Sequence, residues 1–139
     1  MKFRYQKFPY SGPDKTKQWV SRPFILVRFH GLDSQQTPSI YALLDSGADG
    51  VLLPSDIAVG IGIKDFHSGV REYNFGIGQQ TVETYLFDLG LEIIGDGRVL
   101  PVRIGFSEKI AFPIIGRIAF SYFKTVAFHQ KQAEVELIP

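Results

Sequence analysis

A single carboxylate in a tight turn between two apolar runs constrains this chain more than any other feature. The apolar run of residues 41–44 leads to Asp45, the turn Ser46-Gly47 follows, and a second apolar run occupies residues 51–53. Apolar residues on both sides predict strands buried in a core, and a glycine lets the backbone fold back without a Cβ clash. The turn therefore presents Asp45 at a defined place, and the chain supplies only one such carboxylate.

Length and composition limit the class of protein. A chain of 139 residues fits one domain, and an apolar fraction of 45% predicts a folded core. The 15 basic residues are scattered among 14 acidic ones, which argues against nucleic acid as the main partner. No cysteine is present, so disulfides, thiolate metal sites and cysteine nucleophiles are excluded. Neither a signal-peptide core nor a membrane-length apolar run of about 20 residues occurs. We therefore expect a soluble, cytoplasmic protein without a membrane partner.

The pattern of short apolar runs predicts an all-β fold. Residues 1–18 are rich in Lys, Pro, Gly and Ser and are expected to form an N-terminal arm, followed by one domain over residues 19–139. Strands are expected at residues 23–29, 41–44, 51–53, 70–75, 81–93, 99–106, 113–116, 125–128 and 133–138. Short helices are expected at 57–59, capped by Ser55 and Asp56, and at 117–123. Many short strands with little helix indicate a closed, barrel-like antiparallel sheet.

Four sequence pieces occur in an order that is typical of one protein family. They are Arg22-Pro23, the segment 43–49 around Asp45, Gly76-Ile77-Gly78, and the segment 114–117. From about Trp19 to Phe128 the chain resembles the single-domain, retroviral-type aspartic proteases, the retropepsin-like family. The resemblance implies a closed barrel-like retropepsin fold with one short C-terminal helix and one lobe per chain.

The same resemblance implies a homodimeric aspartic endopeptidase. Asp45 would face Asp45 of the partner subunit, and two carboxylates about 3 Å apart would share one proton. One carboxylate would act as a base on a bound water while the protonated one polarises the peptide carbonyl. The expected partners are a second copy and a polypeptide substrate, and neither a cofactor nor a metal is needed.

Supporting roles follow from the resemblance residue by residue. Ser46 would brace the two active-site loops, and Gly47 would shape the turn. Ala48 and Asp49 would lie on the substrate side of that turn. Asp49 would also pair with Arg117 inside one subunit.

Two further pieces carry roles across the assembly. Arg22 would reach across the dimer, and Gly76-Ile77-Gly78 would form the tip of a flap that closes over the substrate. Gln79-Gln80 replace flap glycines of the retroviral enzymes.

Other departures concern the C-terminal half. Ile118 stands where the family often has Asn or Asp, which removes a hydrogen bond at the helix start. Residues 129–132 are expected to turn a hairpin into 133–138, so a dimer sheet need not be built from interleaved termini.

Other interpretations stay open at this point. The alternative function is a non-catalytic, dimeric peptide-binding module of the same fold that keeps the aspartate turn for its architecture. A third possibility is a domain of a longer precursor whose arm is trimmed by self-cleavage near residues 10–17. The chain's three histidines, His30, His67 and His129, lie far apart without ligand spacing, so metal binding is not expected.

Overall fold

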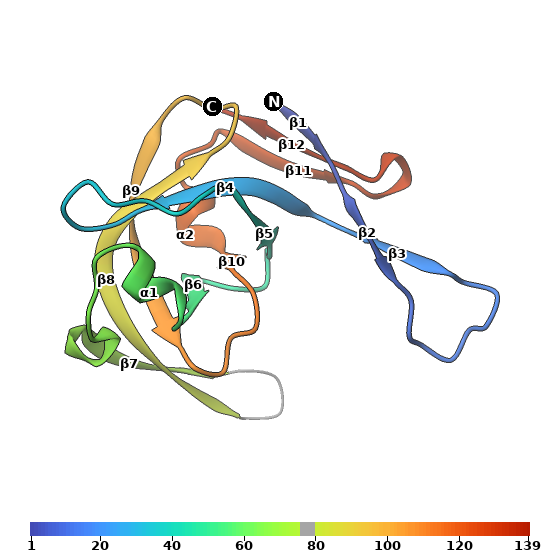
Figure 1. Cartoon of the computed structure of the whole chain (residues 1–139). Coiled ribbons are helices and arrows are strands. Elements are labelled where there is room, and N and C mark those ends of the chain that lie inside the picture. Colours follow the sequence, from blue (N-terminus) through green and yellow to red (C-terminus); the bar gives the residue numbers. More distant parts are fainter. Residues whose placement is uncertain (76–79) are drawn as a thin grey trace.

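Six strands close on themselves to form the barrel that holds the core (Figure 1). The computed structural model describes residues 1–75 and 80–139. In barrel order the strands are β4 (Phe24–His30), β5 (Ile40–Leu44), β10 (Ile114–Ile115), β6 (Val51–Pro54), β9 (Val99–Ser107) and β8 (Thr81–Ile93), and β8 pairs again with β4. The all-β, barrel-like fold class predicted from the sequence is therefore confirmed.

Alternation along the long strands explains why the barrel closes around an apolar interior. On β9, Leu100, Val102 and Ile104 are buried, whereas the residues between them are exposed. Leu89 and Leu91 of β8 lie opposite Val102 and Leu100 and are buried with them. Side chains two residues apart share one face of a strand, so both strands direct an apolar row inward.

The strand directions differ from the prediction. Two pairings are parallel, namely β10 with β5 and β6 with β9, so the sheet is mixed and not purely antiparallel. Alternation of polarity reports which face of a strand is buried but carries no information about the direction of its neighbour. The consequence for the site is large, because β5 and β10 end side by side and present the segments that follow them at one place.

Both α-helices are single turns. They are α1 (Ile57–Gly60) and α2 (Arg117–Phe120), and short 3-10 turns occupy Phe66–Ser68 (η1) and Gln130–Gln132 (η2). The expected helix over 117–123 is too long, since Ser121 already occupies its C-cap position. The expected side-chain cap at Asp56 is also absent. Asp56 has helical dihedral angles, φ −66° and ψ −20°, and not the extended backbone from which a cap side chain reaches back.

The remaining strands lie outside the barrel. Strand β7 (Val70–Phe75) pairs with β8 in a hairpin whose tip is not among the described residues. Strands β1 (Lys2–Arg4), β12 (Glu134–Ile138) and β11 (Thr125–His129) form a three-stranded terminal sheet. The expected hairpin between β11 and β12 is confirmed, and β1 pairs with β12 of its own chain. Figure 1 shows the two chain ends side by side on this sheet.

The last two strands form a separate hairpin. Strands β2 (Gln6–Pro9) and β3 (Trp19–Arg22) pair with each other, and the hairpin projects to the right of the barrel in Figure 1. The sequence analysis predicted neither strand: β2 lies in the expected N-terminal arm of residues 1–18, and β3 at the start of the expected domain. Among the described helices, none is long and apolar enough to cross a membrane.

Candidate active site

Two neighbouring strands hold Asp45 in place at the end of β5. Its backbone N–H donates to the carbonyl of Ile115 on β10 at 3.0 Å, and the preceding Leu44 N–H donates to Pro23 O at 3.0 Å. The side chain is half-buried, and its Oδ1 accepts the Gly47 N–H at 2.8 Å. This side-chain turn orders the carboxylate against its own backbone. One carboxylate oxygen is thus engaged locally, and Oδ2 makes no hydrogen bond to any described residue.

A second backbone segment, which begins at Gly116, packs against the aspartate turn. Gly116 follows β10, and its N–H donates to Gly50 O at 2.9 Å. A Cβ at Gly116 would lie 2.4 Å from Gly50 O and 2.5 Å from Ala48 O, closer than real Cβ atoms approach. Only glycine allows this contact, because the atoms it meets are backbone atoms that cannot rotate away.

The start of α2 is bonded to the same turn. Arg117 N–H donates to Ala48 O at 2.9 Å, and Ile118 N–H donates to Asp49 O at 2.8 Å. The backbone carbonyls of the turn therefore satisfy helix N–H groups that side chains often cap. Ile118 was expected to weaken the start of the helix. Its own N–H is nevertheless hydrogen-bonded, to Asp49 O.

Asp49 and Arg117 are brought together, as the resemblance implied. The Arg117 guanidinium donates to Asp49 Oδ1. Their side chains are 85% and 63% exposed, so the pair contributes little stability in an isolated chain. Ser46 and Gly47 are also exposed. The aspartate turn thus lies at the surface of the single chain.

Two of the predicted site elements stay predictions, because the single described chain does not test them. Arg22 is exposed on β3, where its guanidinium stacks 5.8 Å from the centre of the Phe8 ring, and it contacts neither Asp49 nor Arg117. The expected flap tip, Gly76-Ile77-Gly78, lies outside the described residues. The β7–β8 hairpin that leads to it is described up to Phe75 and from Thr81.

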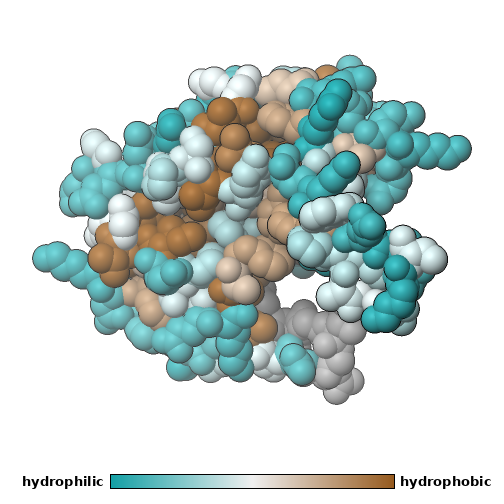
Figure 2. All heavy atoms as spheres, turned by 45° about the vertical axis from the view of Figure 1, so that its right-hand side comes forward, coloured by the Kyte–Doolittle hydropathy of each residue, from teal (hydrophilic) through white to brown (hydrophobic). Residues whose placement is uncertain are grey.

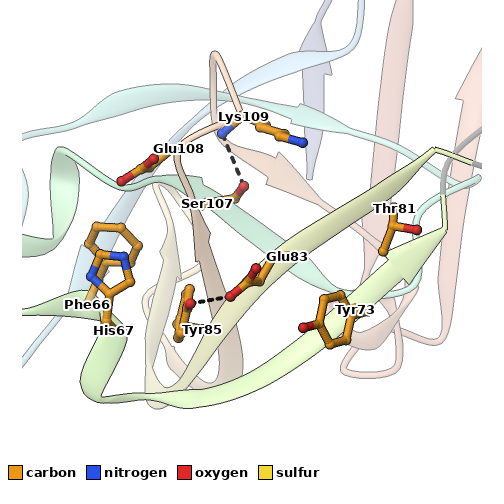
Figure 3. Close-up of a pocket in the computed structure, with 9 residues that line it drawn as sticks. All are labelled: Phe66, His67, Tyr73, Thr81, Glu83, Tyr85, Ser107, Glu108 and Lys109. Carbon is orange, nitrogen blue, oxygen red and sulfur yellow. Dashed lines mark hydrogen bonds between the residues drawn. The ribbon is translucent and has the colours of Figure 1, made fainter.

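A pocket that sequence reasoning missed lies between the β7–β8 hairpin and the loop after β9 (Figure 3). It encloses about 250 Å³. Its lining residues are Phe66, His67, Tyr73, Thr81, Glu83, Tyr85, Ser107, Glu108 and Lys109. Rings from η1 meet Tyr85 of β8 edge to face, with the His67 and Tyr85 ring centres 4.9 Å apart. No local sequence motif marks the pocket, since strands far apart in the chain supply its walls.

Hydrogen bonds shift the pKa of ionisable groups in and beside this pocket. The Tyr85 hydroxyl donates to Glu83, and this bond raises the pKa of Tyr85, since ionisation would put a second negative charge beside the carboxylate. The His67 side chain lies 2.9 Å from Asp65, and this contact lowers the pKa of Asp65. The chain leads from this pocket, through the loop after β9, to Pro113. The Pro113 carbonyl accepts the N–H of Leu43 on β5 at 2.9 Å, two residues before Asp45.

The chemistry of the site is limited to what one carboxylate can do in a single chain. Among the described residues, no group of three or more His, Asp or Glu side chains could hold a metal ion. A lone Asp45 can serve as a base toward water, but it cannot also supply the proton that a peptide carbonyl needs in the same step. The site becomes competent for that chemistry only with a second acid.

The fold defines a class: the closed β-barrel of the retroviral proteases. A solved structure with this fold is that of the EIAV protease complexed with the inhibitor HBY-793. The alignment covers 80% of this chain and 92% of that chain, with a TM-score of 0.54 and 22% sequence identity. No family model and no curated protein sequence matches the chain. The likeness to this known protein is therefore a likeness of fold.

Proposed function

We propose that the protein is a homodimeric aspartic endopeptidase. The observation that carries the proposal is the surface position of a rigidly held, half-buried Asp45 on a retroviral-protease barrel. A carboxylate at the surface of one chain can face its own copy across a twofold axis, and such symmetric pairing is the commonest assembly of soluble proteins. A second copy would thus supply the acid that one chain lacks.

The paired carboxylates would divide the work. In aspartic proteases generally, two carboxylates about 3 Å apart share one proton, because both cannot ionise cheaply. The ionised Asp45 would take a proton from a water held between them as that water attacks the peptide carbonyl. The protonated partner would donate to the carbonyl oxygen, so no covalent intermediate forms with the protein.

The substrate in this proposal is an extended polypeptide. A strand-like peptide would lie between the aspartate turns and the β7–β8 hairpins, with main-chain hydrogen bonds providing much of its affinity. Ser46 would brace the two turns, Ala48 and Asp49 would border the peptide, and residues 76–78 would close over it. Arg22 would reach the partner's Asp49.

Replacement of Asp45 by Asn tests the proposal. Asn keeps a side-chain oxygen that can accept the Gly47 N–H, so the turn and the dimer are expected to persist. Cleavage of a peptide library at mildly acidic pH should fall by at least about 1,000-fold, because the amide cannot serve as the base. Oligomeric state by sedimentation and the melting temperature serve as controls. Undiminished cleavage by the Asn variant would refute the endopeptidase.

A non-catalytic, peptide-binding dimer is the second candidate. The hydrogen bond from Gly47 N–H to Asp45 Oδ1 favours it, because the aspartate already has an architectural use. The same library decides between the two candidates. Peptides retained by the wild-type protein without being cut would identify the binding module.

A further inference from the structure

The hairpin formed by β2 and β3 projects from the barrel without a partner strand. From here on, the arm means this hairpin, residues 6–22, and not the expected N-terminal arm of residues 1–18. Gln6 to Pro9 pair with Arg22 to Trp19, and neither strand pairs with another strand of the described chain. Figure 1 shows the arm directed away from the barrel. Phe8 of the arm packs on Phe24 of the barrel, with ring centres 4.8 Å apart. A two-stranded hairpin by itself is marginally stable in water, so the rest of the arm gains order if another surface covers it.

The arm begins beside the candidate active site. Strand β3 ends at Arg22, and the next residue, Pro23, accepts the Leu44 N–H immediately before Asp45. Any second copy whose Asp45 faces this Asp45 must therefore lie against the root of the arm. Trp19, at the other end of β3 from Arg22, is 57% exposed. The side of the molecule turned forward in Figure 2, on which the arm lies, carries hydrophobic patches within a hydrophilic surround.

The arm and the rest of the domain carry opposite charge. Four basic residues, Lys7, Lys15, Lys17 and Arg22, and one acidic residue, Asp14, lie in the arm. The rest of the chain contains 11 basic and 13 acidic residues, a net charge of −2 against +3 in the arm. The charges are thus less evenly scattered than the overall balance suggests. This separation favours docking of the arm on the body of another copy.

A groove is lined in part by the residues that follow the aspartate turn. It encloses about 290 Å³ and includes Asp49, Leu52, Glu72, Leu86, Arg103 and Ile118 in its lining. Arg103 is hydrogen-bonded to Asp88 at 2.9 Å, which offsets its charge. Glu72 and Asp49, the latter in its ion pair with Arg117, lie at the rim beside apolar side chains, of which Ile118 is 42% exposed. The ionisable lining residues, Asp49, Glu72 and Arg103, carry a net charge of −1.

The root of the arm and the groove both adjoin the segment that carries Asp45. The arm joins the chain through the residue bonded to Leu44, and the groove includes Asp49 and residues 50–52 that follow the turn. In an isologous interface, a surface on one side of the axis meets the surface on the other side in its copy. If the arm of one copy reaches the groove of the other, the reverse contact therefore forms as well.

We propose that the arm of each copy lies in the groove beside the partner's Asp49 and clasps the dimer. This inference rests on the proposed homodimer and names the surface that holds it together. The basic residues of the arm would face Glu72 and Asp49 at the rim, and Trp19 would cover apolar side chains. Because β1 pairs with β12 of its own chain, the clasp would supply contacts between copies that do not depend on interleaved termini.

Charge reversal in the arm tests the clasp. The variant Lys7→Glu/Lys15→Glu/Lys17→Glu should raise the dimer dissociation constant at least 10-fold by sedimentation equilibrium at low salt. The matched control Lys64→Glu/Lys124→Glu/Lys131→Glu changes three exposed lysines of the body and should leave it within about twofold. A second variant replaces residues 11–17 by Asn-Gly, which keeps the Tyr10–Gln18 hydrogen bond as a two-residue turn, and should weaken the dimer likewise.

The position of the arm is tested by cross-linking a mixture of isotopically light and heavy copies. A carbodiimide should join Lys15 or Lys17 of one copy to Asp49 or Glu72 of the other. Mixed light–heavy cross-links support the clasp, and exclusively same-copy cross-links overturn it. A wild-type dimer that both arm variants leave unweakened also overturns it but leaves the endopeptidase intact. Undiminished cleavage by Asp45→Asn refutes the endopeptidase whatever the arm does.

Discussion

At the scale of single residues, the site depends on a glycine, Gly116, as well as on Asp45. Asp45 is held by backbone bonds from two strands, and the turn after it is supported by Gly116. The aspartate provides the chemistry, but the glycine sets how closely the segment after β10 can approach. A methyl group at this position would separate the two segments that place the carboxylate.

Gly116→Ala is therefore expected to destabilise the fold. Its Cβ would meet Gly50 O and Ala48 O, and overpacking of this kind costs about 1 to 3 kcal/mol. Thermal unfolding should show a lower melting temperature, with cleavage reduced because the turn shifts. Gly60→Ala is the matched control, since a Cβ there meets no atom within 4 Å. Equal stability of the two variants would contradict the close approach.

At the scale of elements, one long strand closes the barrel. Strand β8 runs for 13 residues and pairs with β4, β7 and β9. Where it meets β4, Glu92 accepts hydrogen bonds from His30 at 2.7 Å and from Arg28 at 3.4 Å. The hydrogen bond from His30, more than the neighbouring charges, lowers the pKa of Glu92. The seam of the barrel thus contains an ion pair that depends on pH.

Acid should loosen this seam. Because the pKa of Glu92 is lower in the folded state, its contribution to stability is complete above the unfolded value of about 4.5. That contribution is lost as pH falls through the folded value. Denaturant unfolding between pH 6 and pH 3 should show a smaller acid-induced loss for Glu92→Gln than for the wild type.

The control for this experiment is Glu108→Gln. Glu108 is exposed and forms no ion pair within the described chain. Its replacement should leave the acid-induced loss as it is in the wild type. If Glu92→Gln and the wild type lose stability in parallel, the His30–Glu92 contact does not stabilise the seam.

At the scale of the whole molecule, function depends on concentration. One chain has half of the proposed catalytic pair, so only dimers would cleave peptides. The cleavage rate should vary with the square of protein concentration below the dimer dissociation constant and in proportion to concentration above it. Progress curves over a dilution series, compared with sedimentation of the same samples, measure this. Strict proportionality in samples that sediment as monomers would contradict the shared active site.

Much of the fold could be predicted because strands are indicated by short, continuous stretches of sequence. The runs of β-forming residues at 81–93 and 99–106 predicted two strands, and the structure contains both, the second one residue longer. The apolar runs around Asp45 became β5 and β6, with the carboxylate between them. Such signals depend only on residues close together in the chain.

What the sequence could not predict depends on residues far apart in the chain. The parallel pairing of β5 with β10 brings Gly116 beneath Ala48, and no local pattern specifies that neighbour. The pocket around Tyr85 and the groove beside Asp49 are likewise assembled from separate strands. The pairing of β1 with β12 joins the two ends of the chain.

The sequence by itself determined an all-β chain with one aspartate held in a glycine turn between buried strands. The tertiary structure alone decided that the turn lies at the surface, that Gly116 packs against Ala48, and that the arm projects from the barrel beside them. The physical reason is that burial patterns follow from the period of a single strand. Which strands become neighbours follows from the packing of the whole barrel.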